Sequence, residues 1–202
     1  MVNWTSIRIT TPYNIGNIGE KKLEALTKQL LERKVQINAK VNAPDGSIVL
    51  LANNGQQNIV FAPNQITYIS SILSNDINYQ AIKYDFQQIL DALLIDDALQ
   101  YVINLEGNSQ TNNSHEESIQ VFENKLGDLP QEVYGVGYRF LIKDLDFNGE
   151  FKIEPMINNA GLYYYQFILN SIQVSNINSV MEAVKNEIEK NYDCKLNFVK
   201  EN

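Results

Sequence analysis

The strongest constraint on the fold is the segment Val35 to Ala43, in which apolar and polar residues alternate without a break. Successive side chains of a strand point to opposite faces of a sheet, so this period of two predicts a half-buried strand. Turn residues then interrupt the chain at short intervals, at Pro44-Asp45-Gly46, Asn53-Asn54-Gly55 and Pro63-Asn64. The apolar stretches between these turns, as far as Ile72, predict an antiparallel meander of four strands.

Helical periodicity appears on both sides of this meander. Glu20 to Arg33 places leucines at helical spacing and follows a predicted strand at Ser6 to Thr11. A second helix is expected to begin after an N-cap at Ser74 or Asn75, with its apolar stripe ending at Leu93. The first half therefore reads strand, helix, four strands, helix.

The second half repeats this order. A strand at Leu99 to Leu105 is followed by a polar stretch, Glu106 to Asn113, that predicts a loop. Ser114 and Glu117 have the spacing of a capping box and predict the start of a helix. The elements expected after it are strands at Glu132–Lys143, Glu150–Met156 and Gly161–Val174, a helix opened by Ser179, and a short strand at Lys195–Val199.

The predicted fold class is α+β, with two similar halves of order β-α-β-β-(β)-β-α at residues 1–95 and 96–202. Antiparallel sheets with helices packed on one face would bury the apolar side of each strand and join the halves into one compact unit. As an architecture, this order resembles the duplicated saddle of the TATA-binding protein and tandem ferredoxin-like modules. None of the motif residues of the TATA-binding protein is present, so the resemblance implies an arrangement and no activity.

Charge is distributed unevenly along the chain. Residues 1–94 carry eight Lys or Arg and seven Asp or Glu, while residues 95–202 carry eight and seventeen, which together give the net charge of −8. A net of −9 in the second half argues against binding to nucleic acid, because phosphates require clustered cations. It suits a basic partner, or simply a solvated acidic surface.

Compartment and origin follow from composition. The chain has one cysteine, Cys194, which excludes an internal disulfide, and no apolar run long enough to cross a bilayer. With no visible secretory signal, we expect a cytoplasmic protein without membrane contact. The 26 asparagines indicate an AT-rich genome, such as that of a bacterium or a phage.

One candidate metal site lies at Asp144, Asp146 and Asn148, followed by Gly149, in the spacing that begins an EF-hand calcium loop. The twelfth position of that loop needs a bidentate glutamate and here is Pro155. The same residues also fit a β-hairpin with an Asn-Gly turn, which we favour. No metal and no cofactor are therefore predicted.

Two glycines, Gly135 and Gly137, share one face of a predicted strand with Arg139. Missing side chains leave a flat strip that an anionic ligand or a helix could approach closely. A ligand pocket and close internal packing both remain open from the sequence, and packing is favoured.

Aromatic residues are densest at Tyr163 to Phe167, where Tyr163, Tyr165 and Phe167 fall on one face of a strand. Tyrosines bury large areas at little entropic cost and are enriched at protein interfaces, but they also fill cores. Both an interface and the core are consistent with this pattern, and the core is favoured.

No catalytic residues are predicted. His115 is the only histidine, is expected to be exposed at a helix start, and has no nucleophile placed beside it by the sequence. We expect a non-enzymatic protein that binds a protein partner or a second copy of itself. The alternatives are a small-ligand or nucleotide site near Gly135, Gly137 and Arg139, or an enzyme whose residues are gathered only by folding.

Overall fold

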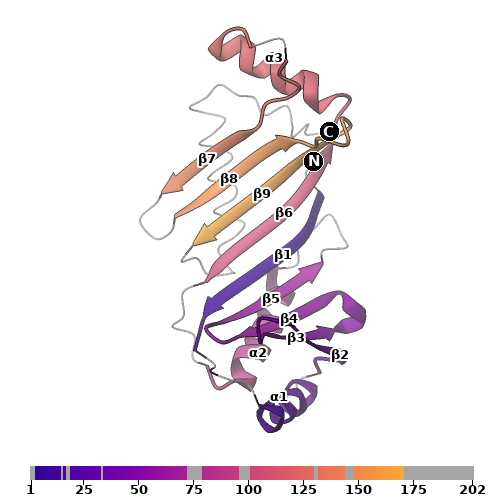
Figure 1. The fold of residues 1–202 in the computed structure, drawn as a ribbon, viewed down its shortest axis with the longest axis vertical. Coiled ribbons are helices and arrows are strands. Elements are labelled where there is room, and N and C mark those ends of the chain that lie inside the picture. Colours follow the sequence, from indigo (N-terminus) through magenta and orange to yellow (C-terminus); the bar gives the residue numbers. More distant parts are fainter. Residues whose placement is uncertain are drawn as a thin grey trace.

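The computed structural model shows an α+β protein built on one large antiparallel sheet (Figure 1). The residues that it describes are 3–14, 16, 19–32, 34–71, 79–95, 101–129, 132–143 and 148–170. Cys194 and the elements expected from residue 171 onward lie outside them, as does the expected N-cap at Ser74 or Asn75.

All nine strands of the described residues belong to this sheet, in the order β2-β3-β4-β5-β1-β6-β9-β8-β7. Their bounds are β1 Asn3–Pro12, β2 Ile37–Asn42, β3 Ile48–Ala52, β4 Gln57–Ala62, β5 Gln65–Ser71, β6 Val102–Gln110, β7 Tyr138–Lys143, β8 Asn148–Pro155 and β9 Leu162–Asn170. The meander predicted from the turn residues is confirmed, because β2 to β5 pair in sequence order. The first strand of each half lies at the centre, where β1 pairs with β5 on one side and with β6 on the other.

Three α-helices occur in the described part of the chain: α1 Glu20–Glu32, α2 Tyr79–Ala92 and α3 Ser114–Leu126. None of them combines the length and the apolar character that a bilayer-spanning helix needs. Figure 1 shows α2 behind the sheet, α1 beside β2 at one end, and α3 beyond β7 at the other.

The core lies between one face of the sheet and the helices α1 and α2. Leu23, Leu26 and Leu30 of α1 are buried at the helical spacing that the sequence predicts. The ring of Phe86 in α2 lies 6.0 Å from that of Tyr68 in β5, centroid to centroid. We call this helix-covered face of the sheet the inner face.

Two predicted boundaries are wrong for the same reason, which is that strand pairing overrides local composition. Most of the predicted loop at 106–113 continues β6 as far as Gln110, since Gly107 and Ser109 pair with the tyrosines of β9. Conversely, the strand predicted from Glu132 begins only at Tyr138, where pairing with β8 starts. Pairing with a neighbour therefore decides where these strands begin and end.

The start of α3 also differs by one residue from the prediction. Asn113 is the N-cap, and its side chain accepts a hydrogen bond from the backbone N–H of Glu116. The Glu117 carboxylate reaches back to the N–H of Asn113 and to the hydroxyl of Thr111. Reciprocal capping is therefore present, but it is centred on Asn113 rather than on Ser114.

Candidate functional site on the outer face of the sheet

The candidate site is the face of the sheet opposite α1 and α2, which we call the outer face. Side chains alternate between the two faces, so Ile7 and Ile9 of β1 are buried in the core while Arg8 between them points outward and is exposed. Within the described residues, no helix lies over this face (Figure 1).

A row of β-branched residues crosses six strands of the outer face. Strand register places them side by side in the order Val41, Val49, Val60, Thr67, Thr10 and Val102. Thr10 and Thr67 share a hydrogen bond of 3.1 Å between their hydroxyls. Val41, at the β2 end, is 49% exposed. Adjacent β-branched side chains on a pleated surface pack against one another and make this row stiff.

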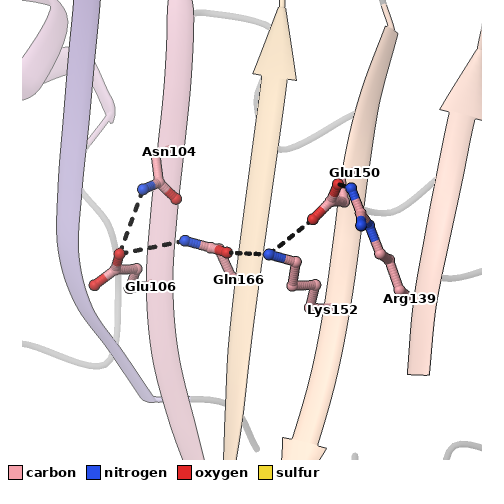
Figure 2. A network of polar contacts seen from close by, with 6 residues as sticks. All are labelled: Asn104, Glu106, Arg139, Glu150, Lys152 and Gln166. Carbon is pink, nitrogen blue, oxygen red and sulfur yellow. Dashed lines mark hydrogen bonds and ion pairs between the residues drawn. The ribbon is translucent and has the colours of Figure 1, made fainter. Parts of the chain in front are cut away.

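A second feature of the outer face is a chain of polar contacts on four strands, β6, β9, β8 and β7, of which β6 also carries Val102; we call this chain the polar ladder (Figure 2). Its six residues are Asn104 and Glu106 of β6, Gln166 of β9, Glu150 and Lys152 of β8, and Arg139 of β7. Glu106 accepts from the amides of Asn104 and Gln166, at 3.3 and 3.4 Å. Lys152 donates to Gln166 at 3.1 Å and lies 2.8 Å from a carboxylate oxygen of Glu150.

Glu150 is the electrostatic centre of the ladder because two cations share it. The ammonium of Lys152, by hydrogen bonding, and then the guanidinium of Arg139 hold the pKa of Glu150 below its usual value, against the opposing effect of desolvation. The side chain of Glu150 is only 13% exposed, whereas that of Arg139 is 64% exposed. Arg139 contacts Glu150 through one terminal nitrogen, so its other donors face solvent.

The outer face thus carries two surfaces side by side. One is the row of four valines and two threonines, which we call the apolar row, and the other is the polar ladder, in which two cations pair with a carboxylate. Protein interfaces commonly combine an apolar centre with a polar, hydrogen-bonded rim. The Glu150 carboxylate accepts hydrogen bonds from two cations, which favours its charged form. The arrangement is suited to binding.

Of the predicted ligand site, Gly137 and Arg139 are exposed and Gly135 is half-buried. A Cβ atom at Gly135 would lie 3.0 Å from Cγ of Pro155 and 3.6 Å from Cδ2 of His115. At Gly137 it would lie 2.9 Å from Cγ of Glu154. At both glycines the nearest atoms are side-chain atoms of the protein itself.

His115 is buried, and the expectation of an exposed helix-start histidine is wrong. Its Nε2 lies 2.9 Å from the carbonyl oxygen of Met156, and its ring lies 4.4 Å from that of Tyr134, centroid to centroid. The ring fills the space that Gly135 leaves open. Through its contact with Tyr134, His115 packs the start of α3 against the segment before β7.

The predicted interface residues Tyr163, Tyr165 and Phe167 lie on the inner face and are buried in the core. The hydroxyl of Tyr163 donates to the carbonyl of Ser114 at 3.0 Å, and Ser109 donates to the hydroxyl of Tyr165 at 3.1 Å. Burial raises the pKa of Tyr165 to about 12 and also raises that of Tyr163. The core alternative therefore describes these three side chains.

At the candidate metal site, Asp144 and Asp146 lie outside the described residues. Asn148 is the first residue of β8 and pairs with Lys143, the last of β7. Its side-chain oxygen accepts from the amide of Asn170 at 2.8 Å. The antiparallel pairing of β7 and β8 agrees with the hairpin that we favoured. Asn148 and Gly149 do not form its turn, however, because they are the first two residues of β8 and pair with Lys143 and Ile142.

Sequence reasoning missed the outer face because its residues come from strands far apart in the chain. Glu106 fell in a stretch predicted to be a loop, and the ladder joins it to Gln166, sixty residues later. One signal was present: Lys152 and Gln166 each occupy the polar phase of an alternating segment. Their alignment depends on register, which no local pattern contains.

A separate concavity lies between α1 and β2. It is a groove of about 540 Å³ lined by Glu20, Leu23, Glu24, Thr27, Lys28 and Leu31 of α1, Ile37 and Lys40 of β2, and Leu50 of β3.

No protein-family model matches the chain, and no curated protein is detectably similar to it. We therefore argue its function from the geometry of these two surfaces.

Proposed function

We propose that this chain is a non-enzymatic binding protein that recognises another protein through the outer face of its sheet. The observation that carries the proposal is the apolar row, which runs across the strands from Val41 on β2 to Val102 on β6, beside the polar ladder on the same face. A partner would bury the apolar row and leave the ladder as a hydrogen-bonding rim.

Rigidity supports this proposal. Each residue of the apolar row belongs to a strand that is paired on both sides, except Val41 on the edge strand β2. The ladder also holds the long side chains of Lys152 and Gln166 in place before a partner arrives. Less conformational entropy is then lost on binding, so that more of the contact free energy appears as affinity.

The partner is either a different protein or a second copy of this chain. The acidic second half favours a basic partner through long-range attraction. A second copy related by a two-fold axis would instead bring the same face of each protomer together. A cytoplasmic location remains part of the proposal.

The test is a pair of charge insertions in the apolar row, Val49→Lys with Val60→Lys. These residues are opposite each other on β3 and β4 and are half-buried, so lysines can extend toward solvent from the folded sheet. We expect the double variant to lose the proteins that the wild type captures from its native extract, or its self-association measured by light scattering.

The matched control is Leu94→Lys, at a side chain that is 87% exposed just after α2. It should retain every partner of the wild type. Capture and oligomeric state that are the same in the wild type, the control and the folded double variant would contradict the proposal. Circular dichroism confirms that each variant is folded.

We also propose that the two halves are related. In each half the first strand pairs with the last described strand, β1 with β5 and β6 with β9, and the remaining strands follow outward. This common order supports a duplicated, saddle-like arrangement of the kind expected from the sequence.

A further inference from the structure

The edge strand β2 lies beside the groove that α1 forms. β2 is the terminal strand of the sheet, and within the described residues only β3 pairs with it. Its other side therefore presents backbone N–H and C=O groups without a strand to bind them. Such an edge recruits an occupant that has a peptide backbone of its own.

The groove beside this edge has an apolar floor and one exposed apolar wall. Leu23 and Leu50 at its base are almost completely buried, while Leu31 on the wall is 53% exposed. Lys40 of β2 adds its aliphatic stem to the lining. A large apolar side chain projecting from a strand added to β2 would enter this groove and cover Leu31.

Charges along the rim give the groove a direction. Glu20, Glu24 and Lys28 follow one another at four-residue spacing on α1, so the α1 side of the rim is acidic at one end and basic at the other, while Lys40 adds a cation on the β2 side. In the part of the chain that the structure describes, none of the three has an ion-pair partner. The span from Glu20 to Lys28 is about 12 Å at 1.5 Å per helical residue.

Positions i, i+2 and i+4 of a strand face the same side and span a similar distance, about 13 Å from the first to the last. Three residues at alternate positions of such a strand would therefore match the rim. A basic residue would meet Glu20 and Glu24, the next, an apolar residue, would enter the groove, and the third, an acidic residue, would meet Lys28. β2 follows α1 after a short turn and lines the same groove, so it runs back along the helix. A strand antiparallel to β2 would then run in the direction of α1.

We propose that the β2 edge and the α1 groove form a second binding site, which takes an extended segment of a partner protein with the pattern basic-x-apolar-x-acidic, antiparallel to β2. The edge strands of a second copy do not fit this pattern. β2 itself reads Ile-Asn-Ala-Lys-Val-Asn, and β7, Tyr138–Lys143, has Arg139, Leu141 and Lys143 on one face, with a cation at both ends.

The test measures fluorescence polarisation of a labelled peptide, Thr-Lys-Thr-Leu-Thr-Glu-Thr, against the full chain. We expect saturable binding that weakens about tenfold or more when the central leucine is replaced by aspartate, because burial of its side chain is lost. Backbone N-methylation at alternate positions should abolish binding, since it blocks pairing with β2. The reversed peptide, Thr-Glu-Thr-Leu-Thr-Lys-Thr, should bind more weakly.

On the protein side, Leu31→Asp should weaken the peptide about tenfold or more, while Leu94→Asp, at a more exposed leucine, should leave it unchanged. Lys28→Glu should shift the preference toward a peptide with lysine at both ends. Absence of binding to the folded wild type, or equal binding to wild type and Leu31→Asp, would overturn the proposal. A dimer that Leu31→Asp dissociates would assign the edge to a second copy and also overturn it.

This site is separate from the outer face, so the two proposals fail independently. The variant Val49→Lys with Val60→Lys should bind the peptide as the wild type does. Loss of captured partners without any peptide binding would leave the proposed function standing and remove only the second site.

Discussion

At the scale of single residues, one glycine lies where two strands approach closely. Gly149 of β8 is that residue, because a Cβ atom there would lie 2.7 Å from the carbonyl oxygen of Ile168 and 2.8 Å from Cδ2 of Leu169. The oxygen belongs to the paired strand β9 and cannot move away alone. Gly149 therefore allows β8 and β9 to approach.

We predict that Gly149→Ala lowers the free energy of unfolding by about 1–3 kcal/mol, the usual cost of overpacking. Urea denaturation followed by circular dichroism measures it. Gly19→Ala is the control for free space, because nothing lies within 4 Å of a Cβ atom there; it precedes α1, where alanine caps less well than glycine, so it should cost about 1 kcal/mol or less. Equal stability of the two variants would contradict the close approach at Gly149.

The charge of Glu150 makes a second residue-scale prediction. Its pKa is lower in the folded chain than the usual value of 4.5, so its stabilising effect is complete above that value and is lost as the pH falls through the folded pKa. Glu150→Gln should therefore lower the Tm at pH 7, and the difference from wild type should shrink between pH 5 and pH 3. A difference that is constant with pH would show that Lys152 and Arg139 do not stabilise the carboxylate.

At the scale of elements, the hydrogen-bond partners available to the backbone decide where a helix or strand ends. The backbone of β6 continues through Gly107 to Ser109, where local composition predicts a loop, because β9 supplies partners for it. The start of α3 depends on a side chain too, since Asn113 rather than Ser114 satisfies the free N–H group of Glu116. Each boundary is thus set by whichever group can satisfy the backbone.

We predict that Asn113→Ala destabilises the protein by about 1 kcal/mol through loss of this cap. Ser114→Ala is the matched control, because the buried hydroxyl of Ser114 has no hydrogen-bond partner in the described structure. Its removal should be neutral or slightly stabilising. Thermal unfolding compares the stabilities of the two variants. A larger loss of stability for Ser114→Ala would show that Ser114 is the N-cap, as the sequence predicted.

At the scale of the whole molecule, the seam between β1 and β6 joins the halves into one sheet. The two strands pair from Asn3 to Thr10, and Trp4 of β1 reaches Phe167 of β9, with ring centroids 5.8 Å apart. Core residues from both halves belong to one continuous apolar cluster. If one half unfolded, the core side chains of the other half at the seam would be exposed to solvent.

We therefore predict one cooperative unfolding transition. The fluorescence of Trp4, the only tryptophan, reports on the seam, and far-ultraviolet circular dichroism reports on all elements, so their midpoints in urea should coincide. Leu30→Ala in α1, far from the seam, should cost about 2–5 kcal/mol and shift both midpoints equally. Two separated transitions would show that residues 1–95 and 96–202 are independent domains.

Local patterns predicted where most described strands and helices of the first half lie, but not which side chains of β2 face the core. The strand predicted to be half-buried is mostly exposed, and a register shift between Ile37 and Ala39 turns Ala39 and Val41 to the outer face. The alternation at Val35 to Ala43 and the turns at Gly46 and Gly55 follow from side-chain direction and from the backbone freedom of glycine, which needs no distant partner. The turn predicted at Asn148-Gly149 is wrong, because both residues belong to β8. The leucine spacing of α1, like the turns at Gly46 and Gly55, was predictable. Such features depend on residues close in sequence.

Both candidate sites were decided by the tertiary structure alone. Glu106, Gln166, Lys152 and Arg139 become neighbours only because β6, β9, β8 and β7 pair in that order and register (Figure 2). A shift of one residue in any of these strands would turn its polar side chains to the core. The sequence alone determined which residues alternate within each strand, whereas pairing between distant strands decided which of them meet, because register is set by the packing of the whole sheet.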